Sequence, residues 1–133
     1  MLLVDTNVLL DLVENDPQWA SWSIQQLDKA ALRYPALAIN SIVYAELSIA
    51  FAKIEELESF ISQAQLVMTA IPREALFLAG KAFIKYRRQG GTKAQVLPDF
   101  FIGAHAAVCG CPLLTRDASR YQSYFPSLQL ITP

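Results

Sequence analysis

The sequence has few of the side chains that bind zinc or act as bases at neutral pH. Its 133 residues include two cysteines, Cys109 and Cys111, and a single histidine, His105. A structural zinc site needs about four such ligands, so this small set excludes one. Glycine-rich phosphate loops and serine–histidine pairs are also absent. We expect the two cysteines to be small buried residues in a reducing cytosol, and His105 to be a packed or surface residue.

Bulk charge and long apolar runs are lacking as well. A net charge of −1 excludes a protein that coats nucleic acid through its overall charge, although it allows a local basic groove. No apolar run approaches the roughly 18 residues that span a bilayer, and the apolar start lacks the basic flank of a signal peptide. We therefore predict a cytoplasmic protein without a membrane partner, folded as one domain over residues 1–133.

Short apolar runs alternate with longer segments of helical periodicity. We predict strands at residues 2–4, 36–40, 112–115 and 128–132. We predict helices at residues 7–15, 17–27, 42–51, 54–67, 73–88 and 98–108. Pro17 suits the first turn of its helix, and Ser41 suits the cap of the next one. This alternation predicts an α/β fold, a three-layer sandwich with a mainly parallel central sheet.

Four acidic residues fall where functional groups gather in such a sheet. Asp5 ends the first strand, and Asp117 follows the third. Asp99 lies in the first turn of a helix, and Glu46 lies inside an otherwise apolar helix. Each acid alone has a structural explanation as a cap, a turn former or a solvated residue. Because ligands of open parallel sheets gather at the carboxyl ends of the strands, we expect the four to converge there.

Converging carboxylates need a reason to lie together, because their charges repel one another. A hard divalent cation with oxygen ligands supplies that reason. Such an ion activates a water molecule and offsets charge on a phosphoryl group. The acids therefore predict a Mg²⁺ or Mn²⁺ site, with Asp5, Asp99 and Asp117 as ligands and Glu46 as a further catalytic acid.

Several segments, taken in order, resemble a known family. They are "LLVDTNVLLDL", "SIVYAEL", "LPDFFIGAHAAVCGCPLLTRD" and the closing strand. Together they are similar to PIN domains, in the branch of VapC-type toxins from bacterial toxin–antitoxin systems. The resemblance implies a Mg²⁺- or Mn²⁺-dependent endoribonuclease that an antitoxin protein inhibits.

The resemblance also assigns residues. The family's catalytic acids match Asp5, Glu46, Asp99 and Asp117. Thr6 and Asn7 match a polar pair after the first acid, and Thr115 matches a hydroxyl that we expect to orient a water molecule or a phosphate.

Two departures and one extra acid accompany these matches. Tyr121 stands where the family often has phenylalanine, a difference to which we assign no chemical effect. Asp117 stands where such toxins often have asparagine. We interpret Asp11 as a solvated surface residue rather than a fifth acid of the site.

A basic segment precedes the Asp99 helix, since residues 73–93 hold six of the eleven lysines and arginines. Its candidate RNA contacts are Arg87, Arg88 and Lys93, and Arg116 beside Asp117 is another. An ordinary solvated helix face explains the segment equally well.

Other enzyme classes fit less well. A haloacid dehalogenase phosphatase needs a second aspartate where Asn7 stands, and a response-regulator receiver needs an acidic pair and a late lysine that are missing. Two alternatives stay open. One is a PIN nuclease for RNA processing without an antitoxin, and the other is an inactive PIN-like binding module.

The hydrophobic content of 53% is high for a small domain. Large apolar residues cluster in the helices before the basic segment: Trp19, Trp22, Phe51, Ile54, Phe60 and Ile61. We predict that a homodimer and an amphipathic antitoxin segment cover part of this surface. A single tightly packed core is the alternative.

Overall fold

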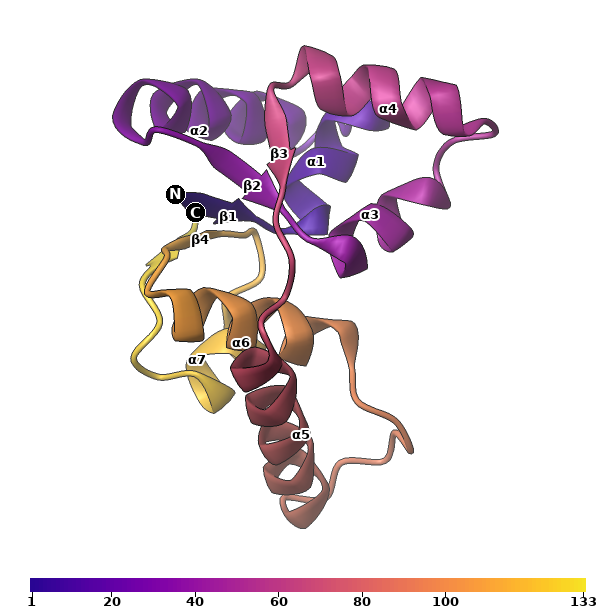
Figure 1. Ribbon diagram of the computed structural model, residues 1–133. Coiled ribbons are helices and arrows are strands. Elements are labelled where there is room, and N and C mark those ends of the chain that lie inside the picture. Colours follow the sequence, from indigo (N-terminus) through magenta and orange to yellow (C-terminus); the bar gives the residue numbers. More distant parts are fainter.

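The computed structural model describes residues 1–133 and has a five-stranded, all-parallel sheet in the order β3-β2-β1-β4-β5 (Figure 1). The strands are β1 (Leu2–Val4), β2 (Leu37–Ile39), β3 (Leu66–Met68), β4 (Leu113–Leu114) and β5 (Leu130–Ile131). The helices are α1 (Thr6–Val13), α2 (Ala20–Arg33), α3 (Ser41–Ser48), α4 (Ile54–Gln63), α5 (Arg73–Arg88), α6 (Pro98–Cys109) and α7 (Ser119–Tyr124). The predicted α/β fold with a parallel sheet is confirmed.

The helices lie on both sides of the sheet. In Figure 1, α1, α2 and α4 lie on one side of the strands, and α5, α6 and α7 lie on the other. The middle strand, β1, is wholly apolar and wholly buried, as expected of a parallel strand covered on both faces. No helix combines the length and the apolar character needed to cross a bilayer.

Strand β3 is not among the predicted elements. Residues 54–67 were predicted to form a continuous helix, but α4 ends at Gln63 and Gln65 adopts a left-handed conformation with φ of 55°. The chain then pairs with β2 as an edge strand in which Val67 and Met68 are exposed. Three apolar residues fit a helix or a strand equally well, so pairing with β2 decides between them.

The start of α2 and the cap of α3 differ from the prediction. The helix expected at Pro17 begins at Ala20, because the Asp16 carboxylate accepts hydrogen bonds from the backbone N–H groups of Gln18 and Trp19, at 2.8 and 2.9 Å. This contact holds residues 16–19 in a turn. The cap of α3 is Asn40 and not Ser41, which is the first helical residue.

Burial also differs from expectation at several apolar positions. Six large apolar residues were predicted to form a surface that a partner covers: Trp19, Trp22, Phe51, Ile54, Phe60 and Ile61. Of these only Ile54 is exposed, at 64%, since the aromatic side chains pack in pairs and Ile61 is buried. Of the two cysteines, Cys111 is buried but Cys109 is exposed. The apolar surplus therefore lies elsewhere, in Leu32, Ile49, Met68, Leu76 and Phe77 among others.

A buried polar contact joins the two helices that carry Glu46 and Asp99. The Asn40 Oδ1 atom accepts from the backbone N–H groups of Ile42 and Val43, so its Nδ2 donates to His105 Nδ1, 3.1 Å away. Burial lowers the pKa of His105, which keeps the ring neutral. His105 is thus a packed residue of α6 that accepts a hydrogen bond from Asn40, the N-cap residue of α3.

We predict that Asn40→Ala lowers the free energy of unfolding by about 1–3 kcal/mol, because it removes a helix cap and leaves His105 without a donor. The neighbouring change Ser41→Ala is the matched control and should stay within about 0.5 kcal/mol of the parent. Urea denaturation measures both. Equal effects of the two changes would mean that Asn40 is not the cap.

Candidate active site

A cavity of about 220 Å³ contains all four acids that the sequence singled out. Its walls are formed by Asp5, Thr6, Asn7, Leu10, Glu46, Asp99, Asp117 and Tyr121. The sheet order explains this meeting, because β1 lies between β2 and β4. Side chains that follow these three strands therefore reach the same edge, and the start of α6 adds the remaining acid.

Asp5 is the most confined of the acids. Its Oδ1 accepts from the Thr6 backbone N–H at 2.8 Å, and its Oδ2 accepts from the hydroxyls of Thr115 and Tyr121, at 2.8 and 2.9 Å. Burial raises the pKa of Asp5 to about 6 even though these donors act in the opposite direction. The carboxylate is therefore held in orientation without a nearby positive side chain.

The other acids are held less tightly. Burial raises the pKa of Asp99, while the Arg120 guanidinium, 3.3 Å from Asp99 Oδ2, lowers it. The Thr6 hydroxyl donates to Glu46 Oε1 at 2.6 Å. Asp117 is exposed, and its Oδ1 accepts from the backbone N–H and the hydroxyl of Ser119. Asp117 thus shapes the turn into α7 and also faces the cavity.

The donor types in the cavity fit a hard divalent cation. They are carboxylate, hydroxyl and amide oxygens, with no histidine or cysteine among them, which favours Mg²⁺ or Mn²⁺ over zinc. As the side chains stand, however, no three His, Cys, Asp or Glu residues lie close enough together to hold an ion. The donor types of these residues fit a Mg²⁺ or Mn²⁺ ion, but their carboxylates lie farther apart than those of a closed metal site.

Thr115 contacts Asp5 from outside the cavity. Its hydroxyl is fully buried, donates to Asp5 and receives the Asn7 side-chain N–H at 3.2 Å. It is not part of the cavity wall. These contacts orient the carboxylate, whereas the sequence analysis expected the hydroxyl to face a water molecule or a phosphate.

The interpretation of Asp11 as a solvated residue is wrong. Asp11 is 2% exposed, and its Oδ2 accepts from the Ser23 hydroxyl at 2.6 Å and from Arg116 Nε at 2.7 Å. The Arg116 guanidinium also lies over the Trp19 ring, 5.3 Å from its centroid. This cluster joins α1, α2 and the loop after β4 outside the cavity, so Arg116 is engaged within the fold.

The remaining predicted RNA contacts lie on the surface. Arg87, Arg88 and Lys93 are exposed, and none of them lines the cavity. Arg87 Nη1 donates to the Lys93 carbonyl at 3.0 Å, which ties the loop after α5 to that helix.

Two residues of the site were not predicted from the sequence: Arg120 was not singled out, and Tyr121, whose hydroxyl was expected to have no chemical effect, contacts two of the acids. Arg120 pairs with Asp99, and the Tyr121 hydroxyl lies 2.9 Å from Asp5 Oδ2 and 3.5 Å from Asp99 Oδ1. Burial, together with the charges of both acids, raises the pKa of Tyr121 well above its ordinary value, so the phenol stays neutral. The available signal was the tyrosine itself, since a hydroxyl is present where an apolar ring would suffice for packing.

Comparisons with known proteins agree with this architecture. The family model of the PIN domain matches residues 2–124. A chain of VapBC2 from Rickettsia felis bound to a promoter DNA fragment superposes with a TM-score of 0.75 and 21% identity, over 99% of this chain and 98% of that one. A chain of VapBC-1 from nontypeable Haemophilus influenzae superposes with a TM-score of 0.71 and 23% identity, over 98% of this chain and 96% of that one. A chain of a toxin–antitoxin complex from Klebsiella pneumoniae superposes with a TM-score of 0.70 and 22% identity, over 100% of this chain and 98% of that one. No curated protein sequence matches the chain.

The raised pKa of Asp5 predicts how stability depends on pH in the metal-free protein. The folded state holds this proton more tightly than the unfolded chain. The resulting stabilisation is full below the unfolded pKa of 3.8 and is lost as the pH rises through about 6. Asparagine at this position does not titrate. As the pH rises from 3.5 to 7.5, the free energy of unfolding of Asp5→Asn should therefore increase by about 3 kcal/mol relative to that of wild type, since one pKa unit is about 1.4 kcal/mol.

The measurement is urea unfolding in EDTA across this pH range. Asp28→Asn, on the exposed side of α2, controls for the general effect of removing a carboxyl. A difference between Asp5→Asn and wild type that does not change with pH would show that folding does not perturb Asp5.

Proposed function

The chain belongs to the PIN domain family, and on that premise we propose that it is a divalent-metal-dependent endoribonuclease that acts as the toxin of a toxin–antitoxin pair. One observation carries the proposal: four acids from four separate segments line a single cavity at the carboxyl ends of the strands. The caps and turns that single acids form do not require four of them to meet, and such a cluster suits phosphodiester hydrolysis. We assign this activity to the cytoplasm, where a protein that cuts RNA and binds an antitoxin would act.

Asp5, Asp99 and Asp117 would hold Mg²⁺ or Mn²⁺, which, when bound, activates water and offsets charge on the phosphoryl group. Thr115 and Tyr121 keep Asp5 in one orientation through their hydroxyls. Glu46 is oriented through Oε1 by the Thr6 hydroxyl, and its Oε2 has no partner within the protein. We therefore assign Glu46 Oε2 to take a proton from the attacking water as the water oxygen bonds to phosphorus. The bond between phosphorus and the leaving oxygen breaks, and the leaving oxygen takes a proton from solvent.

A polyanion must still approach this acidic cavity. Arg87 and Arg88 end α5, and Lys93 lies in the loop that leads to α6 and Asp99. All three are exposed, and we assign them to phosphate contacts that position the RNA without reading its sequence. Arg116 contributes less, because Asp11 already pairs with its guanidinium.

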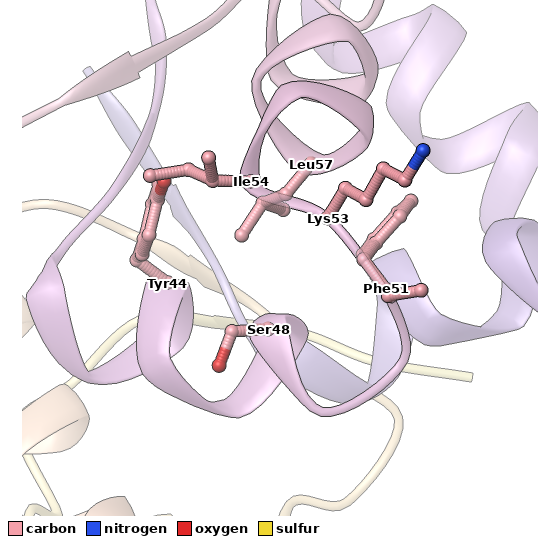
Figure 2. A pocket seen from close by; sticks show the side chains of 7 residues that line it. Tyr44, Ser48, Phe51, Lys53, Ile54 and Leu57 are labelled. Atoms are coloured by element: carbon pink, nitrogen blue, oxygen red, sulfur yellow. The ribbon is translucent and has the colours of Figure 1, made fainter.

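A groove between α3 and α4 suits the antitoxin. It has a volume of about 260 Å³ and is lined by Tyr44, Ser48, Phe51, Ala52, Lys53, Ile54 and Leu57. Figure 2 shows Tyr44 reaching from α3 toward Ile54 at the start of α4, with Lys53 pointing away. Because similar folds occur in toxin–antitoxin complexes, we assign this groove to an amphipathic antitoxin segment. An arginine or lysine from that segment, inserted among the acids, would block the site.

We assign a second copy of the chain to a different surface. Met68, Leu76 and Phe77 are exposed at 51, 45 and 69%, and the first two line an open cavity of about 550 Å³ beside β3 and α5. Apolar side chains gathered in this way favour a symmetric homodimer.

An RNA-processing nuclease without an antitoxin is the second candidate. It would use the same cavity as the toxin. The two candidates differ in whether an antitoxin binds the protein. An inactive PIN-like binding module is the third candidate, and it would fold but cut no RNA.

We expect the purified protein to cut RNA in Mg²⁺ or Mn²⁺ and to stop in EDTA. Asp5→Asn or Asp99→Asn should lower the rate at least about 10²-fold, because each removes a carboxylate from the reacting centre. Asp28→Asn, on the exposed side of α2, should keep the parent rate. Cleavage that persists after chelation, in protein free of contaminating nuclease, would refute metal dependence. A folded protein that cuts nothing would favour the binding module.

We also expect the product of a neighbouring gene to bind the protein and inhibit cleavage. Ile54→Glu should weaken that binding at least about tenfold, because it places a charge in the groove. Leu32→Glu is the matched control, since Leu32 is 91% exposed on α2 and outside the groove. Light scattering and calorimetry measure assembly and affinity. A monomer that no neighbouring product binds would favour the RNA-processing nuclease.

A further inference from the structure

The Tyr121 hydroxyl is the one neutral side-chain donor in the cavity wall that lies within 3.5 Å of two of its acids. We infer that Tyr121 is a positioning residue, whose hydroxyl fixes Asp5 relative to Asp99. The inference rests on the proposed function, because it gives Tyr121 its role through these two carboxylates.

The geometry defines what this hydroxyl does. Tyr121 is 1% exposed, and its oxygen lies 2.9 Å from Asp5 Oδ2 and 3.5 Å from Asp99 Oδ1. A phenol has one proton, so it makes one short hydrogen bond, to Asp5, and keeps Asp99 at the limit of bonding distance. The two acids come from the end of β1 and the start of α6, which no backbone hydrogen bond joins directly.

Packing against α6 fixes the ring. Gly103 lies one turn after Asp99, on the same face of that helix. A Cβ atom at Gly103 would lie 3.0 Å from the Tyr121 ring and 2.5 Å from the Phe125 ring. The absence of a side chain at Gly103 therefore lets the Tyr121 ring lie against α6 with its hydroxyl toward the acids.

Packing alone does not account for the oxygen. A buried hydroxyl is unfavourable unless it is hydrogen-bonded, and the partners of this one are the two site acids. Thr115 holds the same Asp5 oxygen from the end of β4, and Arg120, next to Tyr121, holds the other oxygen of Asp99. Helix α7 thus contacts both carboxylates, and losing the Tyr121 hydroxyl would remove the link between Asp5 and α7 while Thr115 still donates to Asp5 Oδ2.

The first experiment compares Tyr121→Phe with Tyr124→Phe. Both changes remove one hydroxyl from α7, but the Tyr124 hydroxyl contacts Gln89 outside the cavity. Free Mn²⁺ is followed by electron paramagnetic resonance during titration of each protein. Tyr121→Phe should bind Mn²⁺ about tenfold more weakly, the order expected when a partner of a metal-binding group is lost. It should lower kcat and leave KM for RNA unchanged. Tyr124→Phe should match wild type, and equal Mn²⁺ affinity in all three proteins would overturn the inference.

The second experiment needs no metal. Melting temperatures in EDTA are measured for Tyr121→Phe, Asp5→Ala and the double variant. If the hydroxyl holds Asp5, Tyr121→Phe lowers the melting temperature in the parent but has little effect once Asp5 is alanine. Effects that simply add would overturn the inference. If wild type binds no Mn²⁺, the proposed metal-dependent function fails, and this cycle still decides whether Tyr121 holds Asp5.

Discussion

The burial of one carboxylate, Asp5, is the constraint around which the site is organised. This residue ends the central strand and caps α1, so its backbone cannot move without disturbing the sheet and a helix at once. Its side chain is enclosed by donors from α1, from the end of β4 and from α7. Because a buried carboxylate is unfavourable without such donors, these segments must meet around it in one arrangement.

Buried polar contacts outside the cavity then fix the segments that carry the other acids. Asn40 caps the helix of Glu46 and also contacts His105 on the helix of Asp99. Asp11 joins Ser23 on α2 to Arg116, whose neighbour Asp117 is the last acid. Asn40, His105, Asp11 and Ser23 are buried, and an unpaired polar group is costly at a buried position. The arrangement of the acids is therefore a property of the whole fold rather than of one loop.

The same fold has three distinct surface cavities. The acidic cavity lies at the carboxyl ends of the strands, the groove of Tyr44 and Ile54 lies between α3 and α4, and the apolar area of Met68 and Leu76 lies beside β3 and α5. The three are lined by different residues. The contacts proposed for RNA, for an antitoxin and for a second copy can therefore be tested by separate substitutions.

The sequence by itself determined the fold class, the central strand and the extent of α5, because these depend on local periodicity and on short apolar runs. It also singled out the four acids, since each one interrupts an apolar pattern. Tertiary structure alone decided that residues 66–68 form a strand, that Asp11 is buried and that Tyr121 contacts the acids. The physical reason is distance along the chain. Asp11 and Arg116, like Asp5 and Tyr121, are separated by more than three quarters of the sequence, so no local pattern signals that they meet.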